Sequence, residues 1–194
     1  MNKVKVAVFA SGSGSNFQAI MEQEELACEV VLLVCDQPDA SVIDKAATFG
    51  VPTFVFETHH YSTKVEYEQE VISRLKTAQV EWVFLAGFMR LVGPTLLQAF
   101  PARMINIHPS LLPAFPGMDA IGQAFRAKVR TTGVTIHYID EGMDTGPIIA
   151  QEEVAIQESD TRASLAKRIQ KTEHRLYPRI MNQVIREQAT SSES

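Results

Sequence analysis

An asparagine and a histidine two residues apart open the segment NIHPSLLPAFPG, residues 106–117. The residues MINIH that end at His108 predict a β-strand, and side chains at positions i and i+2 of a strand leave the same face. Asn106 and His108 therefore lie together near the carboxyl end of this strand, where open α/β sheets place their active sites. Either residue alone is more often structural, but at a strand end the two form a candidate catalytic pair.

The loop that follows this pair is stiff. Pro109 and Pro113 fix φ and remove backbone donors, and Phe115, Pro116 and Gly117 predict a second turn. A loop of this kind leaves the sheet in one conformation, which suits a preorganised site.

A candidate carboxylate lies far along the chain from His108. In DEGMDTGPIIAQ, residues 140–151, Asp144 stands between Met143 and Thr145 and is followed by a glycine and a proline. A carboxylate beside His108 would orient the imidazole and favour its protonated form. Only the fold can bring the two together.

The segment SGSGSN, residues 11–16, lies between an expected strand and an expected helix that begins near Phe17. Backbone N–H groups of such a loop can hold a phosphate. A dinucleotide fingerprint is incomplete, because Gly12 and Gly14 are followed by Phe17 where a third small residue is needed, although Asp36 stands where a ribose-binding acid would. A monophosphate site and a plain turn capped by a polar residue are the other interpretations.

The histidines outside this pair do not predict a metal site. His59 and His60 are adjacent and are expected to point in different directions, while His137 lies in a strand and His174 on the last helix. The sequence has no HExxH motif and no Cys/His cluster. It also lacks the GxSxG elbow of acyl-serine enzymes, so neither a metal nor a serine nucleophile is expected.

Short apolar strands alternate with helical patterns through the first half of the chain. The expected strands are 4–10, 30–35, 53–56 and 82–86, and the expected helices are 17–26, 41–50 and 62–79. This alternation predicts an α/β fold with an open, mostly parallel twisted sheet and helices on both faces.

The second half adds a strand at 104–108, a short helix at 118–128 and a strand pair at 131–140 and 146–156, which we expect to be antiparallel. Apolar residues at helical spacing predict a last helix over 161–186, and Pro178 should kink or restart it. We expect one domain over residues 1–187 and a polar, disordered tail at 188–194.

Composition limits the partners of this chain. Its 194 residues carry a formal net charge of −5, which argues against a nucleic-acid backbone or an anionic membrane as the main partner. Small molecules or copies of the chain itself are expected, as a monomer or a homodimer. Cys28 and Cys35 read as reduced core residues, and no secretory signal is evident, so the expected compartment is the cytoplasm.

Four segments together resemble one enzyme family, the phosphoribosylglycinamide formyltransferases: SGSGSN, LAGFMRLVGP (85–94), NIHPSLLPAFPG and DEGMDTGPIIAQ. The resemblance extends from about residue 3 to the segment QKTEHRLYP (170–178). It implies a Rossmann-like formyltransferase fold. It also implies transfer of the formyl group of 10-formyltetrahydrofolate, the co-substrate, to the glycine amine of phosphoribosylglycinamide in de novo purine biosynthesis.

The resemblance also implies roles for individual residues. Its catalytic trio matches Asn106, His108 and Asp144, and its substrate phosphate and ribose site matches Ser13, Gly14, Ser15, Asn16, Gln170 and Glu173. Its folate pocket matches Lys64, Met89, Arg90, Leu91, Val92, Leu97, Ile139, Asp140 and Glu141. Lys64 stands where some members carry arginine. Residues 118–125 depart from a histidine-containing stretch of other members, so no catalytic role is assigned to them.

In this chemistry the amine attacks the formyl carbon and a tetrahedral oxyanion forms, which Asn106 and protonated His108 can stabilise by donating hydrogen bonds. Asp144 would hold His108 in its cationic form. Two related families that share the core, methionyl-tRNA formyltransferase and formyltetrahydrofolate deformylase, carry an additional domain for which this sequence leaves no room. A catalytically silent nucleotide-binding module that uses Gly12, Gly14 and Asp36 is the alternative from a different class.

Overall fold

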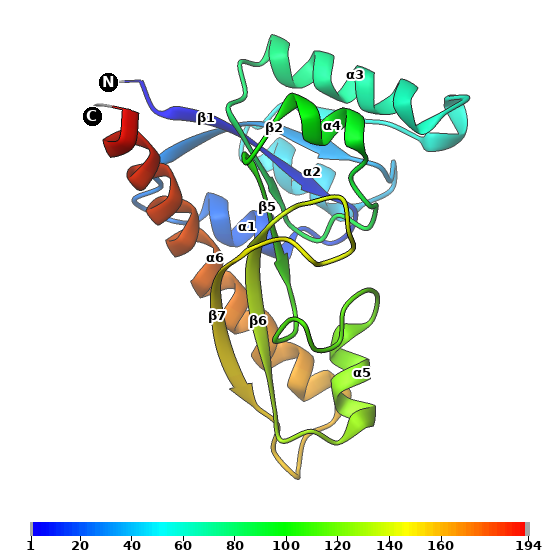
Figure 1. Cartoon of the computed structure of the whole chain (residues 1–194), viewed down its shortest axis with the longest axis vertical. Coiled ribbons are helices and arrows are strands. Elements are labelled where there is room, and N and C mark those ends of the chain that lie inside the picture. The colour runs from blue at the N-terminus through cyan, green and yellow to red at the C-terminus, as the bar shows by residue number, and fades with distance from the viewer. Residues whose placement is uncertain (1, 193–194) are drawn as a thin grey trace.

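A computed structural model describes residues 2–192 of the chain. Within this range seven strands form one sheet in the order β3-β2-β1-β4-β5-β6-β7 (Figure 1). The strands are β1 (Val4–Ala10), β2 (Cys28–Cys35), β3 (Thr53–Val55), β4 (Trp82–Leu85), β5 (Met104–His108), β6 (Thr131–Tyr138) and β7 (Ile148–Ala155). The helices are α1 (Ser15–Met21), α2 (Ser41–Thr48), the 3₁₀ turn η1 (Thr58–His60), α3 (Lys64–Thr77), α4 (Pro94–Ala99), α5 (Ala120–Ala127) and α6 (Arg162–Ser192).

Strands β1 to β5 pair in parallel, and β6 and β7 are added antiparallel. The expected open, mostly parallel sheet with antiparallel strands near its C-terminal part is confirmed. The chain winds outward from β1 to β3 and then returns to the other side of β1 to form β4. The carboxyl ends of β1 and β4 therefore border a topological switch point, which is where open α/β sheets bind ligands.

Helices cover both faces of the sheet, and each face has its own apolar core. One core joins Phe17 of α1 and Val42 of α2 to a long apolar stripe of α6 that includes Leu176. The other joins Leu75 of α3 and Leu96 of α4 to the opposite face. In Figure 1, α1 and α6 lie on one side of the parallel strands, while α3 and α4 lie on the other. Because both faces are buried, the parallel strands are near-continuous apolar runs.

Several boundaries differ from those expected. Helix α1 begins at Ser15 and ends at Met21, well short of residue 26. Helix α4 was not expected at all, although Pro94 stands in its first turn, a position that suits proline. Strand β5 has the bounds that the sequence predicts, 104–108. Helix α3 lies within the predicted range 62–79.

The last helix is longer than expected. It passes through the buried Pro178 as one element, so the expected restart does not occur. It also continues to Ser192, so residues 188–192 are helical where the sequence suggests a disordered tail. The hydroxyls of Ser191 and Ser192 donate to the carbonyl oxygens of Glu187 and Gln188 in the preceding turn. Residues 193–194 lie outside the described range.

Cys28 and Cys35 are free thiols and both are buried, which confirms their assignment to the core. In the described part of the chain, no helix combines the length and the apolar character needed to cross a membrane.

A tyrosine of α6 ties the helix to the two strands that lead into the site. The Tyr177 hydroxyl is buried and lies 2.7 Å from the Leu85 carbonyl oxygen at the end of β4 and 3.3 Å from that of Ile105 in β5. We expect Tyr177→Phe to lower the free energy of unfolding by about 1–2 kcal/mol, because two buried acceptors lose their donor. Urea unfolding measures this change. Tyr61→Phe, which removes a hydroxyl bonded to Glu70 at a more exposed position, is the matched control. Equal losses in both variants would contradict the special role of Tyr177.

Candidate functional site

A cavity of about 430 Å³ opens at the carboxyl ends of β1, β4 and β5. It brings together residues that lie far apart along the sequence. Its lining includes twelve of the expected site residues: Asn16, Met89, Arg90, Leu91, Val92, Asn106, His108, Ile139, Asp140, Asp144, Gln170 and Glu173. Six expected residues do not line it: Ser13, Gly14, Ser15, Lys64, Leu97 and Glu141.

Strand β5 and the loop before β7 bring His108 to Asp144. The His108 Nδ1 atom lies 3.6 Å from Asp144 Oδ2, and its Nε2 atom lies 2.9 Å from the carbonyl oxygen of Phe115. The His108 side chain is only 8% exposed. A carbonyl and a carboxylate can only accept hydrogen bonds, so both ring nitrogens face acceptors. His108 therefore has an oxygen acceptor opposite each ring nitrogen.

The proline-rich loop holds the carboxylate in place. The Gly117 amide at the end of this loop donates to Asp144 Oδ2 over 2.8 Å. Gly117 has a φ of 78°, which favours glycine, and Asp144 itself has a φ of 56°, in the region that asparagine and aspartate tolerate best. The loop thus supplies a carbonyl to His108 and an amide to Asp144.

His137 is a functional candidate that sequence reasoning missed. It lies directly opposite Asn106 in the antiparallel pairing of β5 with β6, so the two side chains share a face. Its Nδ1 lies 2.8 Å from the Tyr138 carbonyl oxygen and its Nε2 lies 3.4 Å from Asn106 Nδ2. Burial lowers the pKa of His137. A neutral ring protonated at Nδ1 therefore presents an Nε2 lone pair that can accept from the Asn106 amide.

The end of the glycine-rich loop meets α6. Gly14 precedes α1 in a left-handed conformation, with a φ of 73°, and Asn16 follows in the first turn. Asn16 hydrogen-bonds the Glu173 carboxyl group, and its Oδ1 atom is buried without a partner in the described part of the chain. Burial raises the pKa of Glu173 to about 7. Ser15 lines a separate groove between α1 and α6.

Asp36 does not behave as a ribose-binding acid. It is 3% exposed, accepts from the Ser11 hydroxyl over 2.5 Å and pairs with Arg90 Nε over 2.7 Å. The same hydroxyl accepts from the Met89 amide over 2.9 Å. Asp36 therefore fixes the loop after β1 to the loop after β4, which removes the main support for a dinucleotide site.

The segment after β4 forms one wall of the cavity, with Met89 and Leu91 exposed at its rim. Lys64 lies outside the cavity and donates from Nζ to the Leu91 carbonyl oxygen over 2.5 Å. The buried Glu68 accepts from the Gly93 amide over 2.8 Å. Helix α3 thus supports this wall from behind.

Residues 117–121, for which the sequence assigned no catalytic role, form part of the opposite wall. Asp119 caps α5 by accepting from the Gly122 amide, and it pairs with Arg126 and with Arg162 of α6. Both Asp119 and Arg162 line the cavity. The only sequence signal for this wall was its position directly after the proline-rich loop.

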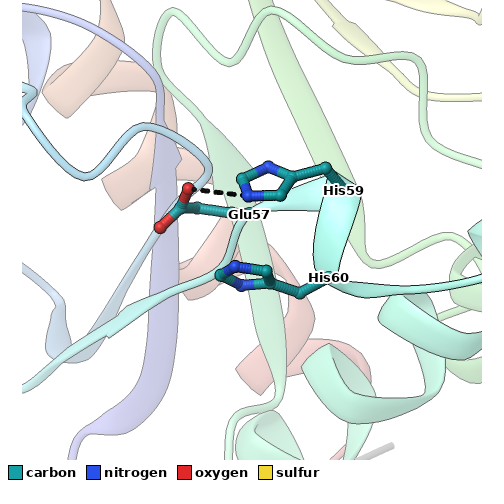
Figure 2. A group of neighbouring side chains, drawn as sticks. All are labelled: Glu57, His59 and His60. Atoms are coloured by element: carbon teal, nitrogen blue, oxygen red, sulfur yellow. Dashed lines mark ion pairs between the residues drawn. The ribbon is translucent and has the colours of Figure 1, made fainter.

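The expectation that adjacent histidines point apart is wrong for His59 and His60. Figure 2 shows both rings and the Glu57 carboxylate turned to the same side of the chain. The ring centroids are 4.2 Å apart. The two residues lie in a 3₁₀ turn that the sequence analysis did not predict. Adjacent side chains there diverge by about 120° instead of the 180° of a strand, so rotation of the two exposed side chains can bring their rings together.

The chain belongs to the formyl transferase family, because the model of that family matches residues 4–181. Phosphoribosylglycinamide formyltransferase of Bacillus subtilis (strain 168) is 54% identical over 184 residues, which cover 93% of this chain and 94% of the relative. The resemblance to the phosphoribosylglycinamide formyltransferases, inferred from four sequence segments, is confirmed.

Solved structures of phosphoribosylglycinamide formyltransferases are similar to that of this chain. Glycinamide ribonucleotide transformylase 1 from Geobacillus kaustophilus superposes with a TM-score of 0.92 at 53% identity, covering 95% of this chain and 100% of that one. Phosphoribosylglycinamide formyltransferase from Bacillus halodurans superposes with a TM-score of 0.91 at 54% identity, covering 93% of this chain and 95% of that one. The Rossmann-like formyltransferase fold expected from the sequence is therefore confirmed.

The buried Glu173 makes stability depend on pH. Its pKa rises on folding from 4.5 to about 7, so its contribution is fully present below pH 4.5 and is lost as the pH rises through 7. We expect the wild type to lose on the order of 3 kcal/mol between pH 5 and pH 8 relative to Glu173→Gln, which cannot ionise. Urea unfolding of both proteins at several pH values measures the difference. Parallel stability curves would contradict the raised pKa.

Proposed function

We propose that the protein transfers the formyl group of 10-formyltetrahydrofolate to the glycine amine of phosphoribosylglycinamide, giving formylglycinamide ribonucleotide and tetrahydrofolate in de novo purine biosynthesis. The observation that carries this proposal is the meeting of Asn106, His108 and Asp144 in the same cavity as Asn16 and Glu173. The relatives named above support the same reaction.

In the proposed mechanism, the amine lone pair adds to the formyl carbon and the carbonyl electrons move to its oxygen. The Asn106 amide donates a hydrogen bond to this oxyanion, and so does the Nδ1–H of the His108 imidazolium, which lies 3.6 Å from Asp144 and so is not hydrogen-bonded to it. One such donor contributes about 3 kcal/mol in other enzymes. Asp144 keeps His108 cationic and accepts the amine proton through water. The oxyanion then re-forms the carbonyl as the bond from carbon to the folate nitrogen breaks. Asp144 returns the proton through water to that nitrogen, and tetrahydrofolate leaves.

The proposed substrate placement extends from the cavity onto neighbouring segments that do not line it. The phosphate binds to backbone N–H groups at Ser13, Gly14 and Ser15, and the ribose meets Asn16, Gln170 and Glu173. The folate lies against 89–92, Leu97 and 139–141. Lys64 acts mainly through its bond to the Leu91 carbonyl, which shapes the folate wall.

This chemistry uses no metal, because the imidazolium and the amide supply the positive field that the oxyanion needs. Both substrates are small molecules, which the net charge of −5 suits better than a nucleic acid or a membrane. We further propose a cytoplasmic enzyme that acts as a monomer or a homodimer.

An assay of tetrahydrofolate release from 10-formyltetrahydrofolate tests the proposed function. Release should require phosphoribosylglycinamide, and the formyl group should appear on its glycine amine. Equal release with and without this acceptor would identify a formylfolate hydrolase instead. Binding of NAD without turnover would favour the silent nucleotide-binding module.

Asp144→Asn keeps the size of the side chain but removes the charge that opposes His108. We expect kcat to fall by about 10⁴-fold, the scale found when a protease loses the carboxylate partner of its catalytic histidine. The folate dissociation constant should change little, because the cavity wall at 89–92 is untouched. Glu158→Gln, an exposed acid in the loop before α6, is the control and should retain full activity. Turnover by Asp144→Asn at the control rate would overturn the assignment.

His137 should act on the reaction through Asn106. We expect His137→Leu to lower kcat by about tenfold, because Asn106 loses the acceptor that orients its amide. His137→Gln, which offers a side-chain oxygen, should recover part of the loss. In an Asn106→Ala background the His137→Leu change should have no further effect on kcat. Independent, multiplicative losses in the double variant would show that His137 acts by another route.

A further inference from the structure

A second cluster of metal-ligating side chains lies outside the catalytic cavity, on the connection between β3 and α3. Glu57, His59 and His60 each offer one ligand atom, and these atoms all lie within 4.8 Å of one another. Figure 2 shows the three side chains gathered on one side of the 3₁₀ turn. None of the three lines the cavity that holds the candidate catalytic residues.

The turn explains why these side chains meet. Glu57 precedes the turn as its N-cap residue, three positions before His60. The His60 amide donates to the Glu57 carbonyl oxygen over 3.0 Å and closes the turn. His59 completes the group, with its Nε2 atom 3.4 Å from Glu57 Oε2.

From this geometry we propose that Glu57, His59 and His60 form a surface site for a divalent transition-metal ion of the Zn²⁺ type. Two imidazoles and one carboxylate are a donor set that such ions prefer over Mg²⁺ or Ca²⁺. Ligand atoms about 2.1 Å from a tetrahedral zinc ion lie about 3.4 Å apart, which is the observed spacing of Glu57 and His59. Three protein ligands leave the fourth position to water.

The side chains can adjust to an ion at small cost. The His59 side chain is 69% exposed, and an exposed ion pair such as that with Glu57 contributes only about 0–1 kcal/mol. The His60 ring is also exposed, and among the described residues its only ring contact is a tilted one with His59. A rotation of the His60 side chain brings its nitrogen to the same ion. The turn leads into α3, so a bound ion would brace the end of the helix that supports the cavity wall.

The test is a titration of the full chain, without a polyhistidine tag and after EDTA treatment, with ZnCl₂ at neutral pH. We expect one saturable site with micromolar affinity and no comparable site for MgCl₂. His59→Ala and His60→Ala should each weaken zinc binding by at least about tenfold, since even outer-shell partners of metal ligands contribute about 10–100-fold. His174→Ala, at a histidine of α6, is the matched control and should retain the affinity.

A spectroscopic readout locates the ion. In ¹⁵N-histidine spectra, zinc should shift the ring signals of His59 and His60 and leave those of His108 and His137 unchanged. Formyl transfer by the His59→Ala/His60→Ala double variant should equal that of the wild type, because the cluster lies outside the cavity. Unchanged zinc affinity in this double variant, or the absence of saturable binding, would overturn the proposal.

Discussion

The Asp144 carboxylate is the group on which the rest of the site depends. It faces His108 at 3.6 Å, accepts from the Gly117 amide at 2.8 Å and lies 3.9 Å from His137 Nε2. These contacts connect β5, the loop that follows it, β6 and the loop before β7. The side chain is only 12% exposed, and a carboxylate largely removed from water needs partners, so Asp144 links all four segments.

The backbone topology of the sheet determines where the residues around Asp144 lie. The parallel strands bring the carboxyl ends of β1, β4 and β5 to one edge, where the loops that line the cavity begin. The pairing of β6 with β5 then sets His137 opposite Asn106. Asp36 joins the loop after β1 to the loop after β4, which carries one wall of the cavity.

Sequence reasoning succeeds where chemistry is local. The strand at 104–108 and the shared face of Asn106 and His108 follow from period-two geometry, and the stiff loop follows from its prolines. It fails where the role of a residue depends on contacts with distant parts of the chain. Asp36 has the spacing of a ribose-binding acid, but its carboxylate forms an ion pair with Arg90, 54 residues away in the sequence. The role of His137 depends on strand register, and the meeting of Glu57, His59 and His60 depends on a 3₁₀ turn too short to show a periodicity.

The central requirement of the proposed mechanism is that His108, which lies between two acceptors, acts as an imidazolium when it stabilises the oxyanion. The most direct measurement is ¹⁵N NMR of the His108 ring in histidine-labelled protein at pH 7.5. The account predicts that both ring nitrogens are protonated in the wild type. A His108 ring with one unprotonated nitrogen at this pH would contradict the account, because the ring would then lack the charge proposed to stabilise the oxyanion.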